Sequence, residues 1–249
     1  MIKIKSKSEI EKMKIASKIV YDTHCYLKAF IKEGITTKRL SELAEEYIIS
    51  RKAEPSFKGL YGFPGAICTS INEEVVHGIP GPRKLKDGDI IKLDIGASYE
   101  GYHGDSAWTY PVGKVSPQAK YLLEHTEKAL YEGLKEARAG NRIGDISAAI
   151  EAYAKKHKLG VVKELVGHGI GSDVHEAPDI PNFGKKNTGP ILKEGMTLAI
   201  EPMLNLGKAD IYMLADNWTI VTDDNSLSAH FEHTILITKD EAIILTGEW

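Results

Sequence analysis

The stretch DIIKLDIGASYEGYHGDSAWTY, residues 89–110, decides the fold of this sequence. Its two runs, DIIKLDIGAS and YHGDSAWTY, are rich in β-branched and aromatic residues and flank a short turn near Glu100-Gly101. This pattern predicts a β-hairpin. Asp94 and Asp105 lie on different runs with their midpoint close to the turn, so we expect their side chains to be nearly opposite each other.

The two aspartates of this hairpin need compensation if they are buried. Like charges that face each other across antiparallel strands repel. The neighbours Ile91, Leu93 and Ile95 indicate that the strand is buried, and a buried carboxylate pair is costly unless it is compensated. A lysine partner, or exposure of one aspartate to solvent, would remove the problem, whereas a metal ion would compensate both charges directly.

Three further residues have the chemistry of metal ligands. His168 lies between glycines in VGHGIG, and the small neighbours let its imidazole approach a site closely. Glu201 lies in the apolar stretch LAIEPM and Glu232 begins the run FEHTILIT, so neither position suits a solvated glutamate. Buried glutamates are almost always paired. A purely structural role for His168 is the alternative. Four carboxylates and one imidazole suit two divalent ions such as Mn, Fe, Co or Zn, rather than a cysteine-rich structural zinc site.

Helices are predicted on both sides of the hairpin. Before it, Ser8 and Glu11 form the pattern of a capping box for a helix that runs to Lys32, and a second helix begins at 36–37 and ends near Arg51.

After the hairpin, Ser116-Pro117 predicts the start of a helix that ends near Arg138, and another helix is expected over about 143–157. Strands are expected at 197–201, 217–222, 231–238 and 242–245.

An internal repeat relates the two parts of the chain. GITTKRLSELAEEY (34–47) aligns with GNRIGDISAAIEAY (140–153), and LKDGDIIKLD (85–94) aligns with LKEGMTLAIE (192–201) at nearly the same offset. Chance similarity between short helices and strands is the alternative, but the two alignments together favour a duplicated unit.

The repeat predicts the organisation of the chain. We expect one α/β (α+β) catalytic domain over 1–249, with two pseudo-symmetric halves of about 1–112 and 113–249. Each half then presents a carboxylate, Asp94 or Glu201, from an equivalent strand into a shared cleft.

Composition excludes several classes of protein. The formal charge of −3 at pH 7 gives no large basic surface, so direct nucleic-acid binding is not expected. The start of the sequence lacks the apolar run of a secretory signal, and no stretch approaches the roughly 20 apolar residues of a membrane span. Cys25 and Cys68 form no CxxC pair, which suits a reducing compartment. A cytoplasmic protein with no membrane partner is therefore expected.

Five motifs carry a resemblance to a known family. They occur in the family's order and spacing: NEEVVHGIP (72–80), KLDIG with YHGDSAWTY (92–110), GHGIGSDVHEAP (167–178), AIEPM (199–203) and SLSAHFEHTILIT (226–238). Each motif alone is modest, but the set is specific and covers nearly the whole chain. The sequence resembles the type I methionine aminopeptidases, which belong to the creatinase-like metallopeptidases of pita-bread fold. The resemblance implies a curved antiparallel sheet backed by helices, with pseudo-twofold related halves.

The resemblance also implies a role for each site residue. Asp94 would bind one ion with both oxygens, Asp105 and Glu232 would bridge two ions, and His168 and Glu201 would complete the set. Glu201 would also move the proton of the attacking water. On the substrate side, the resemblance implies His77 and His175 as catalytic residues that contact the scissile amide. It assigns the pocket for the methionine side chain to Cys68, Phe63 and Trp218.

The activity implied by the resemblance is removal of an N-terminal methionine from nascent proteins and peptides. A metal-bridging hydroxide would attack the first peptide bond when the second residue is small. The cofactors would be two divalent ions, Co, Mn, Fe or Zn. The partner would be the N-terminus of a peptide or nascent chain. The protein would be a monomer that associates transiently with the ribosome.

Three positions depart from the family pattern, and two other activities stay open. Asn217 stands where a glycine is usual, His230 where a glutamine is usual, and Val174 where an aromatic residue is common. A change in the pH response of Glu232 and simple packing are both compatible with His230. The alternatives are a non-catalytic binding protein of the same fold and an enzyme that cleaves X-Pro bonds. The intact ligand set argues against the first, and an assay separates the second.

Overall fold

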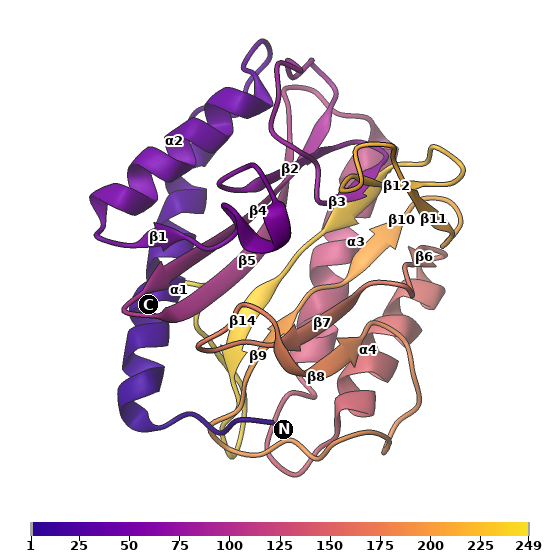
Figure 1. The fold of residues 1–249 in the computed structure, drawn as a ribbon. Helices are drawn as coiled ribbons and strands as arrows, with labels where there is room; N and C mark the ends of the chain where they lie inside the picture. The colour runs from indigo at the N-terminus through magenta and orange to yellow at the C-terminus, as the bar shows by residue number, and fades with distance from the viewer. Residues whose placement is uncertain (1, 249) are drawn as a thin grey trace.

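The helices of the computed structural model, which describes residues 2–248, form two pairs (Figure 1). They are α1 (Lys7–Lys28), α2 (Thr37–Ser50), α3 (Pro117–Leu134) and α4 (Ile143–Lys156). A short 3-10 helix, η1, spans Leu60–Gly62. Among residues 2–248, none of the helices combines the length and the apolar character that a membrane crossing requires.

The helix starts follow local hydrogen bonding. The predicted capping box at Ser8 and Glu11 is wrong, because the cap is Ser6: its N–H donates to Glu9 Oε2 at 2.7 Å, and the N–H of Glu9 donates to Ser6 Oγ at 3.4 Å. The same sequence pattern occurs two residues earlier, where Ser6 adopts the extended backbone that a cap requires. The predicted cap at Ser116 is confirmed.

Two of the helices end earlier than the sequence predicted. Helix α1 ends at Lys28 rather than Lys32, and α3 ends at Leu134 rather than near Arg138. In both cases the chain leaves the helix through turns before the next glycine. The glycines mark the end of the connection and not the end of the helix.

The predicted hairpin is present as β4 (Ile90–Tyr99) and β5 (Tyr102–Pro111). Its two turn residues, Glu100 and Gly101, have φ of 48° and 77°, as a two-residue turn of positive φ requires. The register pairs Asp94 with Ala107 and Gly96 with Asp105. The two aspartates are therefore diagonal neighbours on one face and not directly opposite, which corrects the expected register.

The strands form four hydrogen-bonded sheets in which every recorded pairing is antiparallel. The hairpin sheet adds β1 (Glu54–Pro55) and β2 (Cys68–Ile71) to β4 and β5. A second sheet has the order β15 (Ile243–Ile244), β14 (His233–Leu236), β9 (Thr197–Ile200), β7 (Val166–Gly169) and β8 (Glu176–Pro181). The two small sheets are β13 (Ser228–His230), β10 (Met203–Asn205), β6 (Gly160–Val161) and β11 (Ile211–Met213), β12 (Ile220–Thr222), β3 (Glu74–Val76).

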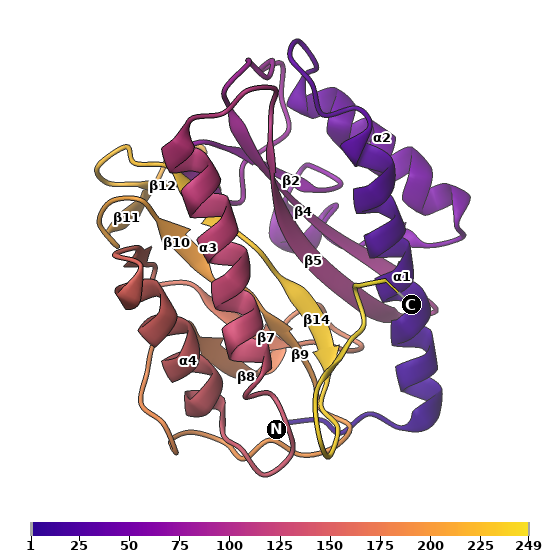
Figure 2. The same ribbon diagram turned by 180° about the vertical axis from the view of Figure 1, so that it is seen from behind.

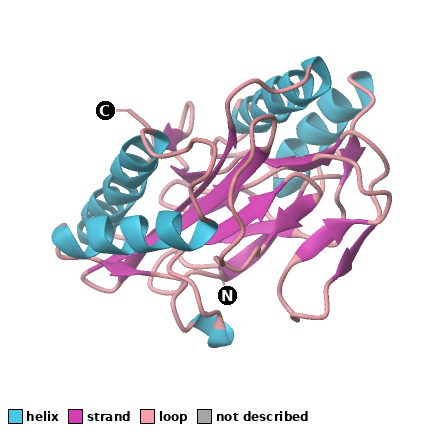
Figure 3. Cartoon of the chain, turned by 90° about the horizontal axis from the view of Figure 1, so that it is seen from above, coloured by secondary structure: helices cyan, strands magenta, loops and turns pink. Residues whose placement is uncertain are grey.

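The helices cover one side of these strands in two pairs (Figures 2 and 3). Helix α1 packs on β4 and β5, while α3 packs on β13, β9 and β10 and α4 packs on β8 and β6. One large apolar core joins α1 and α2 to the hairpin, and another joins α3 and α4 to the second sheet. This architecture confirms the predicted fold class. The boundary near residue 112 and the common origin of the halves stay predictions.

Candidate metal centre and its cavity

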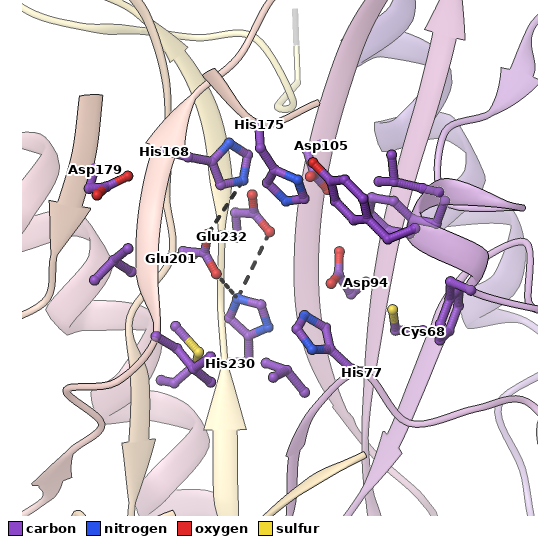
Figure 4. A pocket seen from close by; sticks show the side chains of 18 of the residues that line it. Cys68, His77, Asp94, Asp105, His168, His175, Asp179, Glu201, His230 and Glu232 are labelled. Atoms are coloured by element: carbon purple, nitrogen blue, oxygen red, sulfur yellow. Dashed lines mark ion pairs between the residues drawn. The ribbon is translucent and has the colours of Figure 1, made fainter. Parts of the chain in front are cut away.

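The five predicted metal ligands line one cavity of about 600 Å³. The strands of the two helix-backed cores meet there, and the side chains from β4 and β5 face those from the second sheet (Figure 4). We call one side of this cavity the acidic wall. It consists of Asp94, Asp105, His168, Glu201, His230 and Glu232.

Hydrogen bonds between β5 and residues 232–234 hold the acidic wall together. Thr234 Oγ1 accepts the N–H of Asp105 at 3.0 Å and donates to the carbonyl of the same residue at 2.8 Å. Two residues earlier, Glu232 donates its N–H to the carbonyl of Ala107, and its own carbonyl accepts a bond from Ser106 Oγ at 2.6 Å. Asp105 and Glu232 are therefore fixed relative to each other although they are distant in sequence. The sequence predicted that Glu232 begins the strand, but β14 begins one residue later, at His233.

His168 is placed by the strand β7. Its Nδ1 lies 2.9 Å from the carbonyl of Gly169, which can only accept, so Nδ1 carries the hydrogen and Nε2 faces the cavity. Nε2 lies 3.5 Å from Glu201 Oε1. A Cβ on Gly167 would meet the carbonyl of Ala199 at 2.4 Å. The flanking glycine thus serves the close approach of β9 to β7, and the imidazole gains its position from that packing.

There are two groups of possible ligand atoms that share one residue, and within each group the atoms lie within 4.8 Å of one another. One group is Asp105, His168 and Glu232, and the other is Glu201, His230 and Glu232. Asp94 belongs to neither group, but it lines the same cavity beside Asp105. The structure therefore brings all five predicted ligands together and adds His230 to them.

Several polar atoms of the acidic wall are buried without a hydrogen-bond partner among residues 2–248. They are Asp94 Oδ1, Asp105 Oδ1, Glu232 Oε1 and both ring nitrogens of His230. Buried polar atoms are usually bonded, and unpaired carboxylate oxygens are what a divalent cation binds. The residues present therefore fit a metal ion.

Burial and mutual repulsion raise the pKa values of these carboxyl groups in the metal-free chain. Burial raises the pKa of Asp94 to about 6 and that of Glu201 to about 7. Burial, together with the charges of neighbouring carboxylates, raises the pKa values of Asp105 and Glu232 well above their ordinary range. Burial lowers the pKa of His230 to about 4. A cation would reverse the carboxyl shifts because it favours the ionised form.

The two predicted accessory histidines lie across the cavity from the glutamates. His77 follows β3 and adopts φ of 59°, an unusual conformation for a residue other than glycine. Burial lowers its pKa to about 4, so the ring is neutral. His175 is exposed, and its ring lies edge-on to His168 with centroids 4.5 Å apart. The Tyr61 ring stacks on the other side of His175 at 5.9 Å.

Beside the acidic wall lies an apolar cluster, which we call the apolar wall. It consists of Phe57, Phe63, Cys68, Val174 and Trp218, and all of these except Val174 line the cavity. The rings of Phe63 and Trp218 meet edge to face with centroids 5.1 Å apart. Cys68 pairs with Asp94 across β2 and β4, which places the thiol beside the acidic wall. All three predicted pocket residues therefore line one surface.

Two of the three departures from the family pattern have a structural account. Asn217 has φ of 62°, a left-handed conformation that asparagine tolerates better than most residues, so it can replace glycine there. Val174 is buried in the apolar wall, where it packs with the other side chains. The third, His230, was not among the predicted ligands. The sequence held one signal for it, because residues two apart on a strand share a face and Glu232 is two residues away.

Comparison with known proteins gives consistent results. The model of metallopeptidase family M24 matches residues 11–239. Methionine aminopeptidase 1 of Bacillus subtilis (strain 168) is 56% identical over 246 residues, covering 99% of each chain. The crystal structure of methionine aminopeptidase from Rickettsia prowazekii superimposes with a TM-score of 0.98 at 42% identity, covering 99% of this chain and 100% of that one.

A more distant structure shares the fold. The prolidase from Pyrococcus furiosus superimposes with a TM-score of 0.80 at 23% identity, and the match covers 99% of this chain and 66% of that one.

Proposed function

The chain belongs to metallopeptidase family M24, and from this premise we propose that it hydrolyses the first peptide bond of peptides and proteins that begin with methionine. The observation that carries the proposal is the pairing of the two walls in one cavity. An acidic wall that suits cations lies beside an apolar wall that suits an unbranched thioether side chain. Both are needed for a metal-dependent enzyme with this specificity.

The proposed metal ligands are Asp94, Asp105, His168, Glu201 and Glu232. The unpaired oxygens of Asp94, Asp105 and Glu232 and the raised pKa values of the carboxyl groups support a site for two divalent ions, Co, Mn, Fe or Zn. Two such ions would activate a water molecule and polarise the carbonyl oxygen of the scissile bond.

Glu201 is the proposed proton carrier. Its Oε1 lies 3.5 Å from His168 Nε2 in the cavity, and a carboxylate beside the attacking water can accept and return a proton. It would take a proton from the attacking water and deliver it to the leaving amine nitrogen. The transfer balances because the C–N bond breaks as that nitrogen gains its hydrogen.

His77 and His175 are the proposed contacts to the scissile amide. His77 is a neutral imidazole that can donate a hydrogen bond to the oxygen on which negative charge develops. His175 lies at the exposed side, between His168 and Tyr61, where the peptide beyond the first residue would leave the cavity.

The apolar wall is proposed to hold the methionine side chain. Phe63 and Trp218 provide aromatic surface for the sulfur, and Cys68 closes the pocket beside Asp94. A requirement for a small second residue, action on nascent chains with transient ribosome contact, a monomeric state and a cytoplasmic location belong to the same proposal. Their support is the likeness to methionine aminopeptidases over the whole chain.

Competing peptides test this function. The purified protein loaded with Co or Mn is offered Met-Ala, Leu-Ala and Ala-Pro peptides of otherwise equal sequence. Release of methionine alone is the expected result. Cleavage confined to the Ala-Pro peptide would replace the proposal with an X-Pro peptidase, and no cleavage of any peptide by metal-loaded protein would favour a binding protein.

A further inference from the structure

His230 is a buried imidazole that the proposed reaction does not use. It is 1% exposed at the end of β13 and lines the cavity (Figure 4). Among residues 2–248, neither of its ring nitrogens has a hydrogen-bond partner. His24, which is also fully buried, differs in this respect: its Nδ1 lies 3.1 Å from Tyr110 Oη and its Nε2 lies 3.0 Å from the carbonyl of Ser106.

Hydrogen bonds from two neighbouring strands fix the backbone around His230. Thr109 Oγ1 accepts the N–H of His230 at 3.0 Å and donates to its carbonyl at 2.7 Å. Two residues earlier on β13, the carbonyl of Ser228 accepts a bond from Lys92 Nζ at 2.8 Å. The strand is therefore tied to both β4 and β5, which fixes the backbone from which the imidazole enters the cavity.

The distances from His230 suit a shared cation better than hydrogen bonds. Its Nε2 lies 3.5 Å from Glu201 Oε2 and 3.9 Å from Glu232 Oε2. The second distance is too long for a hydrogen bond, and the first lies at the limit. Bonds of about 2.0–2.2 Å from an ion to nitrogen and oxygen place neighbouring ligand atoms roughly 3–4 Å apart. Both distances fall in that range.

We propose that His230 is a direct metal ligand, so that the centre holds two imidazoles instead of one. Glu201, His230 and Glu232 would hold one ion, and Asp105, His168 and Glu232 would hold another, with Glu232 common to both groups. Asp94 would complete the set from β4. The inference rests on the proposed metal centre and adds a sixth ligand to it.

The added imidazole changes which ions the site prefers. Nitrogen ligands favour Co and Zn, whereas carboxylates suit Mn, so a second imidazole selectively strengthens the binding of Co and Zn. Replacing His230 by glutamine keeps a polar side chain of similar reach but removes the ring nitrogen. We expect His230→Gln to weaken Co binding by about tenfold or more and to weaken Mn binding by less.

Scalar coupling between metal and ring nitrogens tests the inference directly. The full-length protein is labelled with 15N-histidine and loaded with 113Cd, and each histidine bonded to the metal shows a 113Cd–15N coupling. Two coupled histidines are expected in the unaltered protein, and one is expected in His230→Gln. His77→Asn, which removes an imidazole of the same cavity that belongs to neither ligand group, should retain two.

The outcomes separate the inference from the function on which it rests. A single coupled histidine in the unaltered protein would overturn the ligand role of His230 without requiring any variant to fold, and it would leave the metal centre standing. Retention of both 113Cd–15N couplings in His230→Gln would also overturn the ligand role of His230 and leave the metal centre standing. Failure of the unaltered protein to bind Cd, Co or Mn would instead remove the metal centre, and His230 with it.

Discussion

The acidic wall lies on strands or directly beside them, whereas the apolar wall lies in loops except for Cys68 on β2, and the two walls also differ in their contribution to folding. The apolar wall buries aromatic and aliphatic surface, which stabilises the folded chain. The acidic wall gathers four carboxyl groups, and among residues 2–248 one buried oxygen on each of Asp94, Asp105 and Glu232 lacks a hydrogen-bond partner, which opposes folding while these groups are ionised. The acidic wall is thus a place where stability is given up for function, and a bound cation would offset the cost.

A paired carboxylate at the edge of the cavity shows what the acidic wall lacks. Glu176 Oε2 lies 2.6 Å from Lys5 Nζ, and its Oε1 lies 2.9 Å from Lys3 Nζ. Although burial opposes it, bonding to these two lysines lowers the pKa of Glu176 to about 2. Among residues 2–248, therefore, the partly buried Glu176 is held ionised by lysines, whereas Asp105 forms no ion pair with a lysine or an arginine.

The largest expected effect comes from the centre of the acidic wall. Asp105→Asn removes a proposed ligand oxygen, so turnover of a Met-Ala peptide should fall by more than about a hundredfold. Metal content measured after gel filtration should fall in parallel. The exposed carboxylate Asp179 lines the same cavity, and Asp179→Asn is the matched control, which should keep its metal. Full activity and full metal content in Asp105→Asn would contradict the ligand assignment.

The same substitution should stabilise the metal-free chain in a pH-dependent way. Burial raises the pKa of Asp105 in the folded state well above its unfolded value of 3.8. Between these two pKa values the folded state binds more protons than the unfolded state, so the free energy of unfolding falls as the pH rises from the lower value to the higher one. Asparagine removes this loss. The melting temperature of chelator-treated Asp105→Asn should therefore exceed that of the unaltered protein by a margin that grows from a pH of about 4 upward.

The contribution of the histidines cancels in the difference between the melting temperatures of the two proteins. His77, His230 and the other buried histidines have lowered pKa values, so they make the folded protein less stable as the pH falls. These histidines are common to both proteins. A constant or shrinking margin would mean that Asp105 is compensated by something other than a metal.

A smaller effect is expected on the apolar wall. Phe63→Ala removes the ring that packs against Trp218, so kcat/KM for a Met-Ala peptide should fall by about tenfold to a hundredfold while metal content stays unchanged. Loss of metal from this variant would show that the two walls are not separable. An unchanged kcat/KM would place the methionine side chain elsewhere.

The smallest effect is expected at the paired carboxylate. Lys5→Met removes one of the two lysines at Glu176, which directly follows His175, so the loop that carries this histidine should loosen. We expect KM for peptides to rise a few-fold with kcat nearly unchanged, and Lys5→Arg to restore KM. A fall in kcat alone, with no rescue by arginine, would show that Lys5 does not act by positioning His175.

The sequence predicted the hairpin, the four helices and the convergence of the proposed ligands, because these depend on local patterns and on motif order. The hairpin register was missed by two residues. The turn residues Glu100 and Gly101 both have positive φ, and a two-residue turn there pairs Tyr99 with Tyr102 and so places Asp105 opposite Gly96. The turn, rather than the midpoint of the two aspartates, determines the register.

The role of His230 could not be predicted from the sequence, for a different reason. Alternation indicates that it shares a face with Glu232, but not that both of its nitrogens lack partners. That property depends on Thr109 and Lys92, which tie down the backbone of β13 from other strands. Contacts between elements that are distant in sequence decide whether a buried histidine is bonded or free.

Elemental analysis combined with chelation tests the central claim most directly. Protein purified without added metal is analysed for its ions and assayed on a Met-Ala peptide before and after chelation, and again after Co or Mn is restored. We predict that divalent ions, up to two per chain, accompany activity, that chelation abolishes it and that either ion returns it. Undiminished turnover by fully metal-free protein would contradict the account.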